Sequence, residues 1–204
     1  IWLRTQMILS NGAMLFQIIF PYALLILYDR FLNPDHDPSK STQILFIMLP
    51  LAFSLSMGTM ITIMLAEEKE KKNLKTLFLS GIHSAEYLIS ILFYPIILGC
   101  ITIISFPLIL NADLSNHLVE YGVVMTSVAV CVILVNLLVG AVTDTQAKAQ
   151  VNGVIPMMVV AFLPMFSQFS ESISKVAHYT FMGNFIDFFL DKGFTLNFQS
   201  MLVP

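Results

Sequence analysis

The amino-acid sequence predicts an all-α protein, a polytopic bundle of transmembrane helices with five complete spans and the start of a sixth. Hydrophobic residues make up 57% of the 204 residues and charged residues only 11%, whereas ordinary globular proteins carry about 25% charged residues. The surface of a soluble protein of this length would lack the polar groups needed to cover so many apolar side chains. Five apolar stretches also reach the length of about 20 residues that a spanning helix needs.

The spans follow one another through the whole chain, so we expect residues 1–204 to form a single transmembrane domain. They are predicted, in chain order, at residues 7–28, 43–66, 87–110, 121–142 and 151–169. Residues 198–204 are apolar but too few to cross, and we expect them to open the sixth span. Because the chain starts without Met and stops within this short run, both ends of the domain are expected to be incomplete.

The basic residues predict the orientation, because cytoplasmic loops carry an excess of lysine and arginine. With a cytoplasmic N-terminus, six basic residues lie inside and four outside. The inside set is Arg4, Lys69, Lys71, Lys72, Lys75 and Lys148, and the outside set is Arg30, Lys40, Lys175 and Lys192. The sequence therefore predicts a multi-pass protein of the cell membrane, in contact with lipid. Its net charge of −3 argues against a nucleic-acid partner.

The sequence lacks the short motifs of the common catalytic sites. It contains no GxxxxGK(S/T) nucleotide-binding loop, no HExxH metal pair and no GxSxG nucleophile elbow. The four histidines are scattered over loops and span ends, and they do not indicate a metal site, whose ligands must converge. We therefore expect no catalytic residue, no metal and no cofactor on this chain.

Polar residues within the predicted spans are few. Hydroxyl and amide side chains in such positions most often join helices by hydrogen bonds, although they also suit a pathway for an amphipathic substrate. They are Asn11, Gln17, Ser54, Ser56, Thr59, Thr62, Ser105, Thr126, Ser127 and Asn136. Six prolines in five spans predict kinked, mobile helices, which suit a transporter better than a static anchor.

The predicted cytoplasmic segment 67–85, between spans two and three, has the pattern of a short amphipathic helix. Two i, i+4 ion pairs run in the favourable order, acid before base: Glu67–Lys71 and Glu68–Lys72. An apolar patch follows at positions i, i+3 and i+4, formed by Leu74, Leu77 and Phe78. Gly81 suits the left-handed conformation that ends a helix. The patch suits either lipid or a groove on a partner protein, whereas a solvated loop would explain only the lysines.

The predicted outer segment 170–197, after the fifth span, has an aromatic periodicity. Four phenylalanines recur at helical spacing, with polar residues on the other faces; they are Phe181, Phe185, Phe188 and Phe189. This pattern favours a helix lying at, or dipping into, the outer membrane interface. The alternative is an ordinary extracellular loop packed on the spans.

The segment between spans two and three also resembles a known family, the permeases of type-2 ABC transporters (ABC-2). These permeases carry there a pattern close to E-(R/K)-E-x-G-T-L-x-x-L-L-x-S-P, followed by an acid that opens span three. The matching residues are Glu68-Lys69-Glu70, Leu74, Leu77-Phe78, Ser80 and Glu86-Tyr87. The chain departs from the pattern at Lys72-Asn73, where the family often has Gly-Thr, and at Gly81, where it often has Pro.

A second similarity lies around the fifth span. The short polar link 143–150 is followed by Pro156 and by the stretch LPMFSQF. This stretch and the sequence EKEKKNLKTL resemble those of small permeases of Gram-positive bacteria that handle peptides, including bacteriocin export and self-immunity systems. The resemblance covers the whole chain in span order.

The resemblance implies a six-span permease subunit of an ATP-driven exporter. It would pair with a second permease subunit, identical or different, and with two cytoplasmic ATPase subunits that bind ATP and Mg. The coupling helix, residues 68–79, would dock on an ATPase through Glu68, Glu70, Lys71, Leu74, Lys75, Leu77 and Phe78. The outer segment would form part of an extracellular gate that includes Phe181, Phe185 and Phe188.

By the same resemblance, spans one, two and five would face the second subunit across the pathway. Met and aromatic side chains adapt to varied substrates, and core packing is the alternative role for each. The candidate lining residues are Met14, Gln17, Phe53, Met57 and Met60. Export of a peptide-like or amphipathic substrate is the leading hypothesis. The alternative is a non-transport membrane protein, for instance an immunity or scaffold protein that binds a peptide at its outer face.

Overall fold

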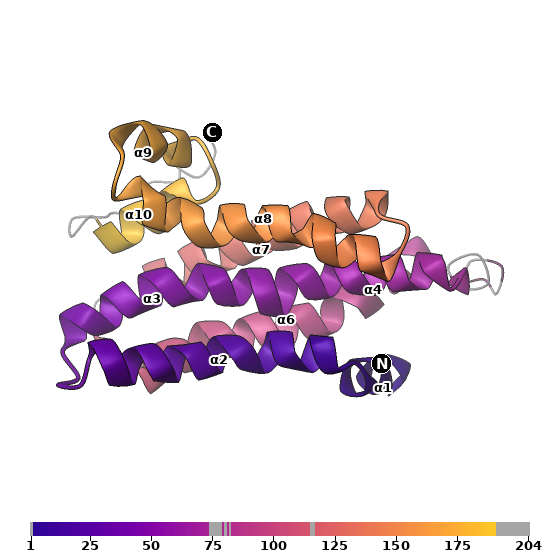
Figure 1. Ribbon diagram of the computed structural model, residues 1–204, viewed down its shortest axis with the longest axis horizontal. Coiled ribbons are helices and arrows are strands. Elements are labelled where there is room, and N and C mark those ends of the chain that lie inside the picture. The colour runs from indigo at the N-terminus through magenta and orange to yellow at the C-terminus, as the bar shows by residue number, and fades with distance from the viewer. Residues whose placement is uncertain (1, 74–78, 80, 82, 115–116, 191–204) are drawn as a thin grey trace.

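The computed structural model describes residues 2–73, 79, 81, 83–114 and 117–190, and their regular structure is helical (Figure 1). The elements are α1 Trp2–Ser10, α2 Gly12–Leu32, α3 Pro38–Ala52, the π-helix η1 Phe53–Thr59, α4 Met60–Glu70, α6 Ser84–Ile109, α7 Leu118–Val142, α8 Gln146–Ser167, α9 Glu171–His178 and α10 Gly183–Leu190. The elements α3, η1 and α4 form one continuous helix. Five helices are then long and apolar enough to cross a membrane. The predicted all-α class with five spans is confirmed.

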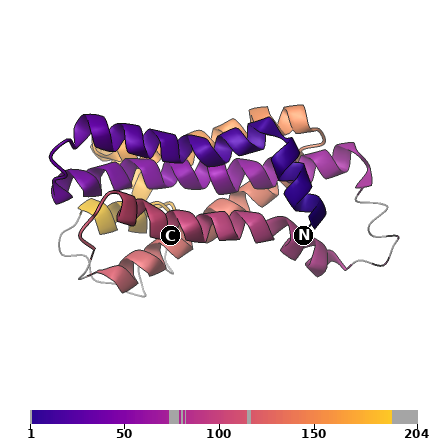
Figure 2. The same cartoon turned by 90° about the horizontal axis from the view of Figure 1, so that it is seen from below.

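The continuous helix Pro38–Glu70 is the centre of the bundle. The long helices lie side by side along one axis (Figures 1 and 2), and α2, α6, α7 and α8 all pack against the central helix. In its most apolar stretch 83% of the residues are buried, compared with 22–39% in the other four helices. The outer helices instead expose large apolar side chains over their length, an arrangement stable only in lipid. The chain is a multi-pass membrane protein.

The first span starts later than predicted, because the helix breaks at Asn11. The Asn11 side chain accepts hydrogen bonds from the amides of Ala13 (3.1 Å) and Met14 (3.4 Å) and so caps α2. Asparagine favours such caps over a helix interior, so Asn11 is not a polar residue within a span. The preceding α1 turns away from the axis of α2 (Figure 2).

Two other spans extend beyond their predicted ends for similar local reasons. Asp37 caps the central helix by accepting from the amide of Ser39 (2.9 Å), with Pro38 in the first turn. Thr145 caps α8 by accepting from the amide of Lys148 (3.3 Å), so that the helix begins at Gln146, five residues before the apolar run at Val151. In both cases the polar residues that precede the apolar run form the first turns of the helix and are not part of a loop.

The π-helical segment lies in the most buried part of the central helix. Its hydroxyls donate to carbonyl oxygens four residues earlier: Ser54 to Pro50 (2.8 Å), Ser56 to Ala52 (2.7 Å) and Thr59 to Leu55 (2.7 Å). Buried hydroxyls need a partner in a low-dielectric interior. The three side chains are therefore satisfied within their own helix, although the sequence pattern had left open a contact with another helix.

Glycines bring the outer helices close to the centre. A methyl group placed on Gly58 would lie 2.5 Å from Asn136 Nδ2, and one on Gly99 would lie 2.6 Å from Met57 Sδ. Beside the first of these contacts, Thr62 Oγ1 lies 3.1 Å from both Asn136 Oδ1 and the Asn136 carbonyl oxygen. The prediction that polar span residues join helices is confirmed for Thr62 and Asn136.

The bundle has two ends with different elements. The Glu70 end contains the C-termini of α4 and α7 and the N-termini of α2, α6 and α8, and the Asn33 end contains the opposite termini with α9 and α10 (Figure 1). In the orientation that the basic residues predict, the Glu70 end is cytoplasmic. That orientation stays a prediction.

Candidate functional site

At the Glu70 end, Lys69 binds the C-terminus of α7. Its Nζ donates to the carbonyl oxygens of Gly140 (3.1 Å), Thr143 (3.2 Å) and Ala141. The last carbonyls of a helix have no partner within the helix, and a positive charge there is favoured by the helix dipole. A lysine of the central helix therefore satisfies the end of a neighbouring helix.

The next residue, Glu70, binds the following helix. Its Oε2 accepts a hydrogen bond from the Gln146 amide (2.7 Å), in the first turn of α8. A carboxylate at a helix N-terminus is favoured by the same dipole. We call Lys69 and Glu70, with their partners in residues 140–146, the terminal clamp. Through it, one helix end is bonded to two neighbouring termini, each by a charge of the favourable sign.

The two preceding glutamates are nearly covered. Glu67 and Glu68 are each 8% exposed. Tyr87 Oη donates to Glu68 Oε2 and so joins α4 to the first turns of α6. Lys71 Nζ lies 2.5 Å from Glu67 Oε1, which confirms the predicted i, i+4 pair. The other oxygen, Glu67 Oε2, is buried and has no hydrogen-bond partner among the described residues.

The start of the predicted coupling helix is corrected. Glu68 and Glu70 belong to α4, which ends at Glu70, and Lys72 follows in the left-handed conformation with φ 57°. A left-handed residue after the last turn ends a helix. Glu68 and Lys72 therefore do not lie one helical turn apart, as the predicted i, i+4 pair required. Gly81 has the left-handed conformation predicted for it (φ 88°). Four predicted docking residues lie outside the described residues: Leu74, Lys75, Leu77 and Phe78.

The candidate pathway residues lie mainly inside the chain's own core. The side chains of Met14, Phe53, Met57 and Met60 are at most 1% exposed, so they are covered by helices of the same chain. Gln17 is partly exposed, and its Oε1 is buried without a hydrogen-bond partner among the described residues. As the helices pack here, core packing accounts for the first four. A role in a pathway stays a prediction.

The predicted outer helix is two short helices, α9 and α10, joined by a turn that contains Phe181. The helical spacing is confirmed for the remaining aromatic residues, which lie in α10. Phe185 is fully buried and stacks on Phe46 of α3 (centroids 5.5 Å apart), and Phe188 contacts Tyr121 of α7 (6.1 Å). The segment is thus helical, as the hypothesis of an interfacial helix predicted. It also packs on the spans, as the alternative hypothesis of an extracellular loop predicted. A gating role stays a prediction.

A pocket of about 730 Å³ opens beside α10 at the Asn33 end. Its walls come from the start of α3, from the connection into α7, from the end of α8 and from α10. The lining residues are Pro38, Ser39, Thr42, Gln43, Phe46, Ile47, Asp113, Leu114, His117, Glu120, Gln168, Phe188, Phe189 and Leu190. Of these lining residues, only Phe188 was a predicted site residue. The others come from four separate segments of the chain, and no local sequence pattern shows that these segments meet.

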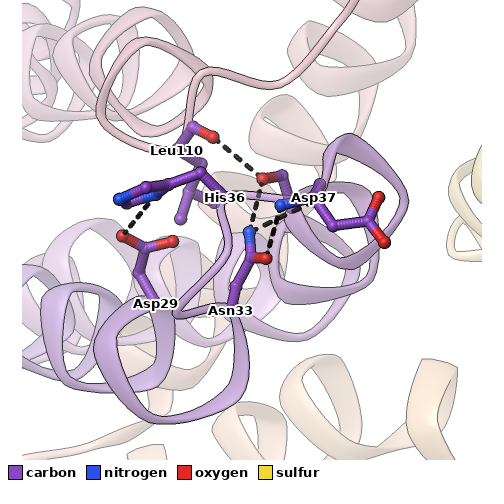
Figure 3. A network of polar contacts seen from close by, with 6 residues as sticks. Asp29, Asn33, His36, Asp37 and Leu110 are labelled. Carbon is purple, nitrogen blue, oxygen red and sulfur yellow. Dashed lines mark hydrogen bonds and ion pairs between the residues drawn. The ribbon is translucent and has the colours of Figure 1, made fainter.

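A buried amide joins three helices at the same end (Figure 3). Asn33 Oδ1 accepts from the Asp37 amide (2.7 Å), and Asn33 Nδ2 donates to Ser41 Oγ (3.0 Å). Ser41 Oγ in turn donates to the Leu110 carbonyl oxygen (2.9 Å) at the end of α6. We call Asn33, Asp37, Ser41 and Leu110 the Asn33 joint. It fixes the α2–α3 connection to α6 without any charge at its centre.

Sequence reasoning missed both the terminal clamp and the Asn33 joint. In the sequence, Lys69 is one of several lysines of the predicted cytoplasmic segment. Asn33 belongs to a stretch rich in Asn, Pro and Asp, which is typical of a turn. The one local signal for the clamp was adjacent opposite charges, Lys69 and Glu70, at a span end. Comparison of the chain with protein-family models, with curated proteins and with solved structures finds no match. The likeness to ABC-2 permeases therefore stays a resemblance of motifs.

Proposed function

We propose that the chain is the permease subunit of an ATP-driven exporter of the ABC-2 type. It moves a peptide-like or amphipathic substrate out of the cell and does no covalent chemistry itself. ATP and Mg are bound by two partner ATPase subunits, and a second permease subunit completes the pathway. Five candidate spans and the resemblance of residues 68–87 support this proposal.

The observation that carries the proposal is the terminal clamp. The predicted coupling segment 67–85 includes Lys69 and Glu70, and these two residues bind α7 and α8. A push on the segment would therefore reach three helices at once. Packed helices of this kind move as rigid bodies rather than by continuous deformation. This arrangement supports a role in passing motion from an ATPase to the spans.

In this proposal the apolar residues of the segment supply most of the docking energy. Burying an apolar side chain contributes about 1.5–3 kcal/mol, whereas an exposed ion pair contributes about 0–1 kcal/mol. Leu77 and Phe78 would fill a groove of the ATPase, and the exposed Glu70 and Lys71 would lie at its rim. Glu68 is nearly covered by its own chain and is reassigned from the rim to the support of α6.

The deciding experiment is purification of the tagged chain from its native membranes in mild detergent, with identification of its partners. We expect an ATPase with a nucleotide-binding loop in near-equal amount. Leu77→Asp should abolish its recovery at matched expression, and Lys71→Ala should leave it within about twofold. Purification without an ATPase, or equal recovery with Leu77→Asp, would contradict the proposal.

The second candidate is a membrane protein that binds a peptide at its outer face without transporting it. The pocket at the Asn33 end favours this candidate, because it is a formed cavity far from the terminal clamp. In that case the chain would purify alone, and ATP would have no effect on export from cells. Binding of a peptide to the purified chain would then be blocked by substitutions in the pocket.

A further inference from the structure

The pocket beside α10 has an aromatic wall. The rings of Phe46 and Phe189 are 5.8 Å apart, and those of Phe188 and Phe189 are 5.2 Å apart at nearly a right angle. Phe46 is almost fully buried and fixes this wall on α3. The volume of about 730 Å³ lies within the range of about 300–1,000 Å³ typical of small-molecule sites.

The lining also contains acidic side chains. Asp113, His117 and Glu120 belong to it, and none of the described lining residues is lysine or arginine. His117 Nδ1 lies against Glu120 Oε2, so the imidazole is held by a carboxylate rather than offered to an anion. The amide of Ser39, at the start of α3, is already bonded to Asp37. Two carboxylates, those of Asp113 and Glu120, therefore belong to the described lining.

We propose that this pocket binds an amphipathic organic cation, a small molecule with one positive nitrogen on an apolar body. Aromatic faces attract cations in a partly desolvated site, and Asp113 and Glu120 supply the opposite charge. The apolar body would lie on Ile47 and Phe189, whose side chains are partly exposed in the lining. The volume of the pocket suits a small molecule. The proposal does not depend on an ATPase partner, so it can hold or fail independently of the exporter proposal.

The test uses the full chain purified in a maltoside detergent, whose head group carries no ammonium. Fluorescence polarisation would measure binding of rhodamine 6G, an amphipathic cation, and of fluorescein, an anion of similar size. We expect saturable binding of rhodamine 6G and none of fluorescein at the same concentrations. Equal binding of both dyes would show an unselective apolar pocket, and absence of rhodamine binding would show no cation site. Either result would overturn the proposal.

Substitutions locate the binding. Glu120→Gln combined with Asp113→Asn should weaken rhodamine 6G binding at least about tenfold, because it removes both opposite charges. Asp35→Asn removes an exposed carboxylate from the same end outside the pocket, and it should change the affinity by less than about twofold. Equal losses with both variants would assign the binding to general surface charge and overturn the proposal.

A second variant guards against misfolding of the first. Phe189→Leu keeps an apolar side chain but removes a ring of the wall, and it should weaken rhodamine 6G binding by about threefold or more. Each variant must elute from a sizing column like the wild type. Unchanged affinity in a well-folded Phe189→Leu protein, together with unchanged affinity in Glu120→Gln alone, would place the dye elsewhere.

Discussion

The two ends of the bundle are held together by different chemistry. At the Glu70 end, the long charged side chains of Lys69 and Glu70 reach across to the termini of α7 and α8. At the Asn33 end, short neutral groups bond inside a covered joint and aromatic rings stack beneath α10. Flexible charged contacts at a surface form and break at little cost, whereas buried amides and rings are costly to separate. The termini at the Glu70 end are therefore joined mainly by charged side chains, and those at the Asn33 end by neutral and aromatic ones.

The test with the largest expected effect assigns the two ends to the two sides of the membrane. In a protein with Cys100 and Cys131 replaced by alanine, a cysteine at Asp35 should react with an impermeant thiol reagent on intact cells. A cysteine at Lys71 should react only after the cells are opened, because the basic Glu70 end is predicted to be cytoplasmic. The reverse labelling would place the Glu70 end outside the cell and the Asn33 end in the cytoplasm.

The largest loss of stability is expected from Phe185→Ala. Phe185 is fully buried against Phe46, and such truncations cost about 3–5 kcal/mol in soluble cores. The free energy of unfolding, measured by denaturant titration in detergent, should fall by a similar amount. Phe31→Ala at the same end is the control, since Phe31 is exposed. A fall as large for Phe31→Ala would mean that α10 does not hold this end.

A smaller loss is expected when the Asn33 joint is opened. Asn33→Ala leaves the Asp37 amide without its acceptor, at about 1–3 kcal/mol for a buried group left unpaired, while Ser41 Oγ keeps its bond to the Leu110 carbonyl oxygen. The unfolding midpoint should fall clearly, and Asp35→Ala in the same connection should leave it nearly unchanged. A stability of Asn33→Ala equal to that of Asp35→Ala would show that the joint contributes nothing.

Opening the terminal clamp should cost less stability but affect coupling. Lys69→Met removes a charged donor from the end of α7, worth up to about 2 kcal/mol at a partly covered helix end. Under the exporter proposal, ATP hydrolysis by the assembled complex should no longer respond to substrate. Lys72→Met, in the turn that follows, is the matched control for charge. Normal coupling in Lys69→Met would remove the clamp from the mechanism.

The smallest effect is expected from the exposed pair Glu171–Lys175 on α9, whose charged atoms are 3.2 Å apart. An exposed i, i+4 pair contributes about 0.2–0.5 kcal/mol, so Lys175→Ala should change stability by no more than this. The pair should also weaken with salt. If Lys175→Ala lowered the free energy of unfolding more than Lys69→Met does, the exposure of a contact would not predict its contribution to stability.

The sequence was sufficient for the class and number of helices but not for their roles. Apolar runs predicted all five spans, yet the buried central helix is less apolar than α6 and α7, which face outward. Lipid and protein interior are similar solvents, so hydropathy does not separate the two environments. Span ends were misplaced where capping by Asn11, Asp37 or Thr145 decides the boundary.

The site could be predicted only where its residues are close in the sequence. The Glu67–Lys71 pair and the aromatic spacing of α10 were visible as local periodicity. The Lys69 contact with Gly140 and the Ser41 contact with Leu110 each join residues about 70 positions apart. No local pattern records such pairs, because they depend on which helices become neighbours. The pocket was missed for the same reason.

The contact of Gly58 with Asn136 has a consequence for how this sequence can vary. A methyl group at position 58 would meet the amide nitrogen of Asn136 at 2.5 Å, and that amide also bonds to the Val132 carbonyl oxygen (2.9 Å). A larger residue at position 58 would therefore displace the Asn136 side chain from its hydrogen bonds to Thr62 and Val132. We expect positions 58 and 136 to change together during divergence, with a bulkier residue at 58 accompanied by a smaller one at 136. Such paired exchange would mark the centre of this bundle in any set of aligned relatives.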